Sequence, residues 1–255
     1  MLANPSRKAD YGFGVGEFLW YWNGQDDLKT MLYYNKRMGK FSDDGVTLNS
    51  AYGRRIRARL DLETMWSASQ WDACKKTLID DPDSRRAILI INRPEDNIIA
   101  AYEGSKDVPC TLSLQFFIRR NRLDLHVTMR SSDTFWGLSY DLFTFTLLQE
   151  CMLLELRREM PALELGTYSH CSGSLHIYEH HFKISSAVVE DYLSKEFQAA
   201  APMEPFDLSE LAELSTREKA LRTGKVDDIG ATQFHGRTRW MAERLQEHRR
   251  KRDAE

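Results

Sequence analysis

Alternating apolar and polar residues mark the centre of the chain. Residues 112–118 carry apolar side chains on both faces of a strand-like segment, the polar run 119–122 interrupts them, and a second segment follows at residues 123–129. This pattern predicts an antiparallel hairpin. Because the open ends of a hairpin are neighbours, we expect Cys110, before the first strand, and Arg130, after the second, at the same end of the sheet.

Helical and strand-like patterns surround the hairpin. Helical spacing of apolar residues predicts helices at residues 17–22, 28–38, 66–79, 142–158 and 186–198. Short strands are predicted at residues 87–91, buried on both faces, and at residues 165–174. We expect loops at residues 1–15 and 92–107. These elements place the chain in the α+β class.

The composition changes near residue 199. Residues 199–205 have a linker composition, residues 208–221 a charged helical pattern, and residues 241–255 a high density of charge. We therefore predict a domain at residues 1–199 and a charged helical extension at residues 200–255. The basic run 249–252 is interpreted as a solvated helix end, with nucleic-acid contact as the alternative.

Length and charge set further limits. A chain of 255 residues can bury a substantial core, and its formal net charge of −3 gives no general attraction to nucleic acid. The four cysteines contain no CxxC pair and are too sparse for a disulfide scaffold, which favours a reducing cytoplasm. No segment reaches membrane-spanning length and no signal-peptide core is present. We expect a cytoplasmic protein with no membrane partner.

Cys110 is the candidate nucleophile. A cation beside a thiol favours the thiolate, and Arg130 is the cation that the hairpin is expected to supply. A metal site is the competing idea, because several histidines lie between residues 170 and 181. The segment around His176 has an extended pattern, which does not favour a joint ligand role, so we expect no metal. His176 and Tyr178, two residues apart, would instead share one strand face.

Several motifs recur in the order and spacing of the thymidylate synthase family. They are residues 81–86, Pro109–Cys110, residues 130–133, Gly137 with Asp141, and residues 176–178. The resemblance covers roughly residues 16–184. More narrowly, residues 82–86, Cys110–Thr111 and residues 173–182 resemble the deoxycytidylate 5-hydroxymethylase branch.

The resemblance implies a fold, an assembly and a cofactor. The expected fold is a thymidylate synthase-like α+β domain at residues 1–199, with a mixed sheet, helices on one sheet face, and a second copy packed on the other face in a homodimer. Arg85 and Arg86 would bind the nucleotide phosphate of the partner subunit. The expected cofactor is 5,10-methylenetetrahydrofolate.

It also implies roles for individual residues. The expected catalytic residues are Cys110, Glu17 and Asp141. The expected substrate-binding residues are Tyr52, Arg85, Arg86, Arg130, Ser131, Ser132, Asp141, His176 and Tyr178. The expected cofactor-binding residues are Glu17, Asp133, Trp136 and Gly137. Asp141 stands where synthases carry asparagine, and its alternative role is that of an N-cap before a helix at Leu142.

The reaction implied is hydroxymethylation of dCMP or CMP at C5. Thr111, where synthases usually carry histidine, resembles the hydroxymethylases, and Arg85 with Ser131 favours the deoxynucleotide. The alternatives are methylation of dUMP or dCMP, and a non-catalytic nucleotide- or RNA-binding homologue. The family's N-terminal phosphate-binding arginine has no evident counterpart, so Arg7, Arg54 or no residue replaces it.

Overall fold

The computed structural model describes residues 7–61, 67–194 and 207–254. Contacts within the chain define two compact units. The first unit comprises residues 1–19, 133–144 and 176–255, and the second comprises residues 20–132 and 145–175. The predicted linker at residues 199–205 lies outside the described residues, so the division at residue 199 stays a prediction.

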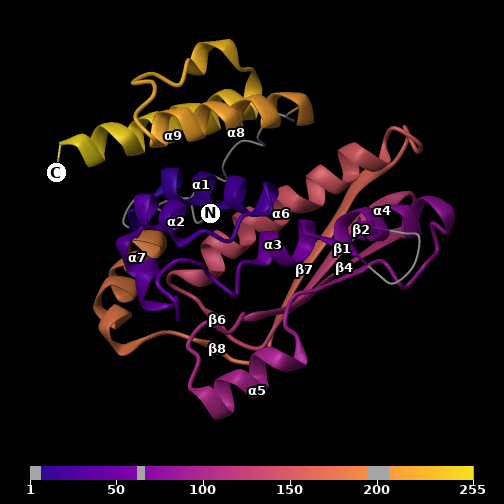
Figure 1. Ribbon diagram of the computed structural model, residues 1–255, viewed down its shortest axis with the longest axis horizontal. Helices are drawn as coiled ribbons and strands as arrows, with labels where there is room; N and C mark the ends of the chain where they lie inside the picture. Colours follow the sequence, from indigo (N-terminus) through magenta and orange to yellow (C-terminus); the bar gives the residue numbers. More distant parts are fainter. Residues whose placement is uncertain (1–6, 62–66, 195–206, 255) are drawn as a thin grey trace. The chain divides into compact units, whose positions relative to one another are not determined.

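The second unit is built on a four-stranded mixed sheet in the order β3-β4-β5-β7 (Figure 1). The strands are β3 (Ile88–Ile90), β4 (Thr111–Arg119), β5 (Arg122–Met129) and β7 (Glu164–Ser172). β3 and β5 both run antiparallel to β4, and β7 runs parallel to β5. Arg120 and Asn121 form the hairpin turn at φ 52° and 59°, values that suit a two-residue turn. The predicted hairpin and mixed sheet are confirmed.

Helices of this unit cover one face of its sheet. Trp71 of α4 (Gln70–Asp80) packs edge-on against Phe116 of β4 at 6.2 Å. Gln149, in the part of α6 (Gly137–Leu156) that belongs to this unit, donates to the carbonyl of Leu123 on β5 at 2.8 Å. The β5 residues on the covered face are buried: Leu123, Leu125, Val127 and Met129. The core therefore lies between these helices and the sheet.

The opposite sheet face carries exposed apolar side chains. Ile88 and Ile90 of β3 are 37% and 43% exposed. The expectation that this first short strand is buried on both faces is therefore wrong for the single chain. The alternate residues Ala87, Leu89 and Ile91 are fully buried, and Leu89 points to the helix-covered face.

Capping residues set several helix ends that apolar spacing misplaced. Asn35 ends α2 (Leu28–Tyr34) and accepts a bond from the Arg37 amide, so a 3₁₀ turn, η2 (Lys36–Lys40), replaces the predicted continuation. Ser69 accepts a bond from the Asp72 amide and starts α4. Before it, β1 (Arg59–Asp61) pairs with β2 (Ser67–Ser69). The predicted first residue of that helix, Trp66, lies outside the described residues.

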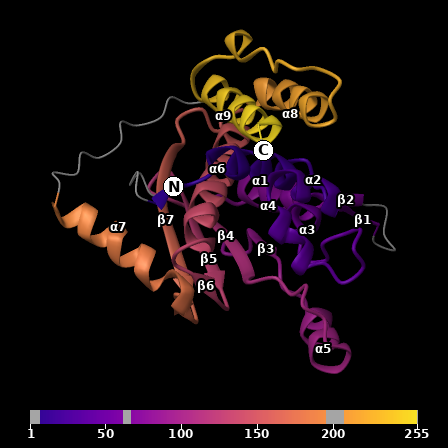
Figure 2. The same cartoon turned by 90° about the vertical axis from the view of Figure 1, so that its left-hand side faces the viewer.

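The predicted loop at residues 92–107 contains a helix, α5 (Pro94–Glu103). Pro94 occupies its first turn, and the Asp96 carboxylate accepts from the Arg93 amide at 2.7 Å, two standard helix-start features. Asp96 also forms a buried ion pair with Arg55 of α3 (Tyr52–Arg57). Figure 2 shows α5 standing apart from the strands of its unit, and its apolar residues Ile98 and Tyr102 are exposed.

The first unit is mainly helical. Its elements are the N-terminal part of α1 (Tyr11–Trp22), the start of α6, η3 (Glu179–His181), α7 (Phe182–Ser194), α8 (Leu208–Arg222), η4 (Ala231–Gln233) and α9 (Gly236–Asp253). Helices α8 and α9 lie side by side in Figures 1 and 2. A two-stranded pair, β6 (Ser132–Asp133) with β8 (Leu175–His176), joins the motifs at residues 130–133 and 176–178.

Helix α1 begins at Tyr11, within the predicted loop of residues 1–15, and not at Glu17. A Cβ on Gly12 would overlap the His248 Cβ and approach the Arg244 carbonyl oxygen to 2.9 Å, both in α9. The glycines that suggested a loop are thus helical, and at Gly12 glycine permits close helix packing. Among the described residues no helix has the length and apolarity to cross a membrane.

Candidate active site

The hairpin of the second unit brings Cys110 and Arg130 together. The Arg130 amide donates to the Cys110 carbonyl at 2.9 Å. The Arg130 guanidinium donates to the carbonyls of Pro109 at 3.0 Å and Val108 at 3.1 Å, so it lies along the segment that leads to Cys110, the candidate nucleophile. The predicted position at one end of the sheet is confirmed, and the half-buried Cys110 is a thiol.

Tyr52 lies next to this nucleophile segment. Its hydroxyl accepts from the backbone amide of Thr111 at 3.3 Å, and its ring stacks on Phe145 at 6.2 Å. Gly53 allows α3 to approach α1, because a Cβ there would overlap the Tyr21 backbone. Tyr52 is therefore buried and held by its surroundings with its polar end at the residue after Cys110.

The other predicted phosphate ligands of this unit differ in exposure. Arg85 and Arg86 are exposed at the turn before β3. Ser131 is half-buried, whereas Ser132 is buried, and its amide donates to the Ser174 carbonyl at 2.9 Å. Within the described part of the chain the Ser132 hydroxyl has no hydrogen-bond partner. The two arginines are thus accessible to a ligand or a second copy.

In the first unit, Glu17 and Asp141 form a pair of perturbed carboxyl groups. Burial raises the pKa of Glu17 to about 8, and the nearby charge of Asp141 adds to this effect. Burial raises the pKa of Asp141 to about 7. Both groups can therefore exchange protons near neutral pH. Because α6 begins at Gly137 and not at Leu142, Asp141 lies inside the helix, and the N-cap alternative is wrong.

Asp133 organises the start of α6. Its two carboxylate oxygens accept from the amides of Phe135 at 3.0 Å and Trp136 at 3.2 Å. A Cβ on Gly137 would lie 3.6 Å from the Asp141 carboxylate and 3.8 Å from the Asp133 Cβ, which are ordinary contacts. The contacts around Gly137 therefore do not demand glycine at this position.

An aromatic cluster follows, which the sequence did not reveal. Trp136 stacks on Tyr140 at 6.4 Å with an interplanar angle of 10°. The Trp136 indole N–H donates to Nε2 of His181 at 2.8 Å, and the His181 ring stacks on Phe135 at 4.5 Å. Nε2 must be unprotonated to accept this bond. Trp136 and Tyr140 are one helical turn apart in the sequence, and this spacing could have predicted their contact. The predicted helix began only at Leu142, so the spacing was not recognised.

Arg7 lies against this cluster. Its guanidinium carbon is 4.6 Å from the centre of the Phe135 ring, and Nη2 donates to Ser139 Oγ at 2.5 Å. The side chain is 2% exposed, and burial lowers its pKa. Arg54, the other candidate for the missing phosphate arginine, is exposed and lies 3.6 Å from Asp26. Arg7 is thus a buried cation, whereas an arginine that binds a nucleotide phosphate must be accessible to the ligand.

His176 and Tyr178 are in ring contact, 5.0 Å apart and perpendicular. Strand β8 ends at His176, so the expectation of a shared strand face is wrong for Tyr178, which precedes η3. Among the described residues no group of three or more His, Cys, Asp or Glu side chains is arranged to hold a metal. The close sequence spacing of the histidines therefore does not produce a metal cluster there.

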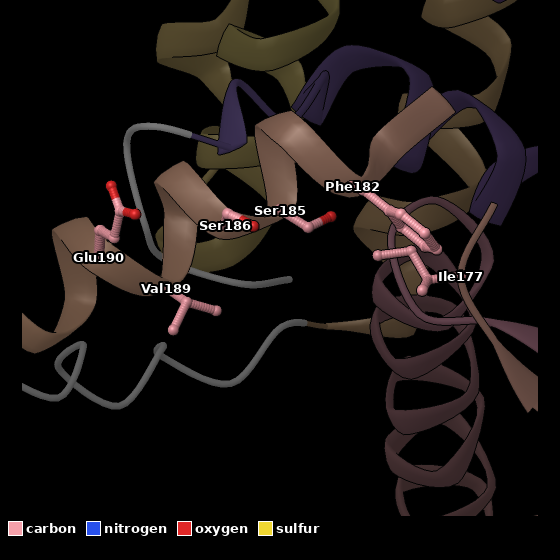
Figure 3. A pocket seen from close by; sticks show the side chains of 6 residues that line it. All are labelled: Ile177, Phe182, Ser185, Ser186, Val189 and Glu190. Atoms are coloured by element: carbon pink, nitrogen blue, oxygen red, sulfur yellow. The ribbon is translucent and has the colours of Figure 1, made fainter. Parts of the chain in front are cut away.

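An open, largely apolar pocket of the first unit lies elsewhere. It is lined by Ile177, Phe182, Ser185, Ser186, Val189 and Glu190 (Figure 3). Five of these residues, from Phe182 to Glu190, belong to α7, and none of the six was predicted as a site residue.

Helix α7 begins at Phe182, earlier than the predicted residue 186. The predicted helix end at residues 195–198 lies outside the described residues.

The predicted site residues fall into two groups. The second unit holds Tyr52, Arg85, Arg86, Cys110, Arg130, Ser131 and Ser132. The first unit holds Glu17, Asp133, Trp136, Gly137, Asp141, His176 and Tyr178. One group thus contains the candidate nucleophile and the arginines, and the other contains the two carboxyl groups with raised pKa values and Trp136.

Comparisons with known proteins agree on one family. The family model described as thymidylate synthase matches residues 5–235. The chain is 35% identical over 210 residues to a deoxyuridylate hydroxymethyltransferase of Bacillus phage SP01, covering 76% of this chain and 51% of that protein. It is 31% identical over 140 residues to the deoxycytidylate 5-hydroxymethyltransferase of Enterobacteria phage T6, covering 53% of each. The chain thus spans about half the length of these relatives.

A solved structure shows the same fold. The thermostable thymidylate synthase A from Bacillus subtilis aligns with a TM-score of 0.57 and 23% identity, covering 74% of this chain and 64% of that one. The expected thymidylate synthase-like α+β fold is confirmed.

Proposed function

Because the chain belongs to the thymidylate synthase family, we propose that it hydroxymethylates C5 of a pyrimidine deoxynucleoside monophosphate, with dCMP as the substrate. The observation that carries the proposal is Asp141, a carboxyl group whose pKa is raised to about 7. It stands where synthases carry asparagine.

Cys110 supplies the nucleophile in this proposal. Its sulfur adds to C6 of the base, and the electrons of the C5–C6 double bond become available at C5. Arg130, fixed to the carbonyls before Cys110, contributes positive charge near the thiol and a phosphate donor. A reducing cytoplasm would keep the thiol available.

Glu17 moves protons in the proposed reaction. After C5 has bonded to the one-carbon unit, removal of the C5 hydrogen by a base, with cleavage of the carbon–nitrogen bond to the departing tetrahydrofolate, would give an exocyclic methylene on the nucleotide. A carboxyl group with a pKa of about 8 both accepts and donates protons near neutral pH. Water then adds to the methylene and loses a proton, and reversal of the C6 addition releases Cys110.

The described residues fit the proposed cofactor, 5,10-methylenetetrahydrofolate. When bound, it supplies a one-carbon unit at the oxidation level of formaldehyde. Trp136 and Tyr140 form a stacked aromatic surface suited to a planar heterocycle. Asp133 uses its oxygens for two backbone amides but keeps further lone pairs for ligand N–H groups. Gly137 leaves room for close approach of a ring to the backbone.

Asp141 matches cytosine when it is protonated. Its carbonyl oxygen can accept from the C4 amino group while its hydroxyl donates to N3. The raised pKa keeps a substantial protonated fraction near neutral pH. This pairing uses both oxygens of one carboxyl group.

Hydroxymethylation of dUMP is the second candidate, because the SP01 relative is named for deoxyuridylate and matches more of the chain than the T6 relative. A protonated carboxyl group also fits uracil, since it can accept from N3–H and donate to O4. A protonated Asp141 therefore fits either base.

The proposed assembly is a homodimer in which Arg85 and Arg86 act on the partner's nucleotide. Both arginines are exposed. The sheet face that carries Ile88 and Ile90 is uncovered in one chain. A second copy on that face would bury these side chains.

The deciding experiment identifies products by mass spectrometry. The protein is incubated with methylenetetrahydrofolate and, separately, dCMP, CMP and dUMP. We expect 5-hydroxymethyl-dCMP from the wild type, no product from Cys110→Ala, and a shift towards dUMP in Asp141→Asn. Unchanged base preference in Asp141→Asn would remove Asp141 from base selection.

Other products would select the alternatives. A hydroxymethyl product from dUMP alone supports the second candidate, and one from CMP overturns the choice of the deoxynucleotide. A methyl product shows that hydride transfer prevails over water addition. No product from any nucleotide, together with dCMP binding that survives Cys110→Ala, would support a non-catalytic nucleotide-binding protein.

A further inference from the structure

Helix α9 packs on the two helices that carry the carboxyl pair. It lies beyond residues 5–235, the segment that the family model matches. Trp240 of α9 contacts Tyr11 of α1 at 5.9 Å and Phe143 of α6 at 6.3 Å. Gly12 of α1 faces the His248 side chain so closely that no other residue fits there without movement. The C-terminal helix is therefore in contact with both α1 and α6.

A polar connection runs along the same interface. His248 Nδ1 lies 3.2 Å from the Asp10 carboxylate. The same carboxylate accepts from the Phe13 amide at 2.9 Å, which caps α1. The Asp10 amide donates to the Tyr140 hydroxyl of α6 at 3.1 Å. Asp10 thus joins α9, the start of α1 and the start of α6.

This connection ends at the stacked rings of Trp136 and Tyr140, the proposed binding surface for the folate. The ring of Tyr140 stacks on Trp136 and meets Phe13 edge-on at 4.8 Å. A change in the Asp10 position would therefore move Tyr140, and Tyr140 would move the Trp136 surface. Arg7 and His181 also contact Trp136, whereas α9 reaches the cluster through Asp10 and the Tyr140 hydroxyl.

We propose that α9 is a positioning element of the active site, with His248 as a positioning residue that acts through Asp10 and Tyr140 on the Trp136 surface. The inference rests on the proposed function. His248 contacts neither substrate nor cofactor in this scheme. It sets the position of the Trp136 and Tyr140 rings on which the folate stacks.

The test compares His248→Ala with the conservative His248→Asn, whose amide nitrogen can replace Nδ1 as a donor to Asp10. The control is Arg239→Ala, an exposed α9 residue that pairs with Glu243 on the same helix. We expect His248→Ala to raise the KM for methylenetetrahydrofolate roughly two- to thirtyfold, the usual range for coupling through neighbours, with the KM for dCMP unchanged. His248→Asn should restore most of the loss.

A binding measurement separates this inference from the proposed function. Tetrahydrofolate affinity is measured by calorimetry with dCMP present, and we expect the same loss in His248→Ala. If the wild type forms no product but its tetrahydrofolate affinity depends on His248, the proposed function fails and the positioning role stands. If the wild type turns over and His248→Ala behaves like Arg239→Ala, or if both KM values rise equally, the positioning role is overturned.

Discussion

Glu17 illustrates how one residue connects stability to pH. Its folded pKa of about 8 lies above the ordinary glutamate value of 4.5, so the folded state binds a proton more tightly than the unfolded state. The associated stability is fully present below pH 4.5 and is lost as pH rises to about 8. Each unit of pKa difference corresponds to about 1.4 kcal/mol, so the loss amounts to several kcal/mol at most.

We therefore predict that Glu17→Gln flattens the decline of stability between pH 5 and 8. The amide cannot ionise, so the remaining decline in that range comes from groups such as Asp141, whose pKa is also raised. Urea denaturation at several pH values measures the effect, with Glu103→Gln on exposed helix α5 as the control. Parallel stability curves for wild type and Glu17→Gln would show that Glu17 is ionised throughout.

A substitution at Gly137 tests whether the folate binds next to this residue. An added Cβ would make only ordinary contacts, and alanine has a higher helix propensity than glycine by about 1 kcal/mol. We expect Gly137→Ala to leave thermal stability unchanged or slightly raised while increasing the KM for methylenetetrahydrofolate. A rise in Tm with an unchanged KM would place the folate away from Gly137.

At the scale of elements, the contact between α1 and α9 depends on Gly12. We predict that Gly12→Ala destabilises the protein by about 1–3 kcal/mol, because the methyl group overlaps the His248 Cβ and crowds the Arg244 carbonyl. Gly39→Ala is the matched control, since its Cβ would meet only Leu32 at 3.4 Å. Urea unfolding of both variants gives the comparison, and equal effects would argue against close packing at Gly12.

Other elements show why local patterns misplace helix ends. Helices α1, α6 and α7 begin at Tyr11, Gly137 and Phe182, each earlier than apolar spacing indicated. Glycines in the first turns of α1 and α6 have low intrinsic helix propensity, so the sequence favours loops there. Tertiary contacts such as Gly12 against His248 override that preference.

At the scale of the whole molecule, a dimer with shared sites makes a specific prediction. Cys110→Ala and the double variant Arg85→Ala/Arg86→Ala should each be inactive, because each damages both sites of its homodimer. Mixed dimers contain one undamaged site, so mixing after mild unfolding should restore about a quarter of wild-type activity. Ultracentrifugation checks the dimer, and no recovery from confirmed mixed dimers would place the arginines in their own subunit's site.

The sequence by itself determined the parts of this protein that depend on local order. The hairpin, the position of Cys110 beside Arg130 and the succession of family motifs follow from residues near one another in the chain, where periodicity and turn chemistry suffice. The motif at residues 130–141 identified Asp133 and Asp141 as site residues before any contact was known. These features survive because few distant contacts are needed to specify them.

Only the tertiary structure decided the environment of those residues. The raised pKa values of Glu17 and Asp141 arise from burial, which depends on everything packed around them. The contact between Asp10 and His248 joins positions near opposite ends of the sequence, and no local pattern encodes it. The motifs therefore identified the candidate site residues, whereas the pKa values and positions of their side chains follow from long-range packing.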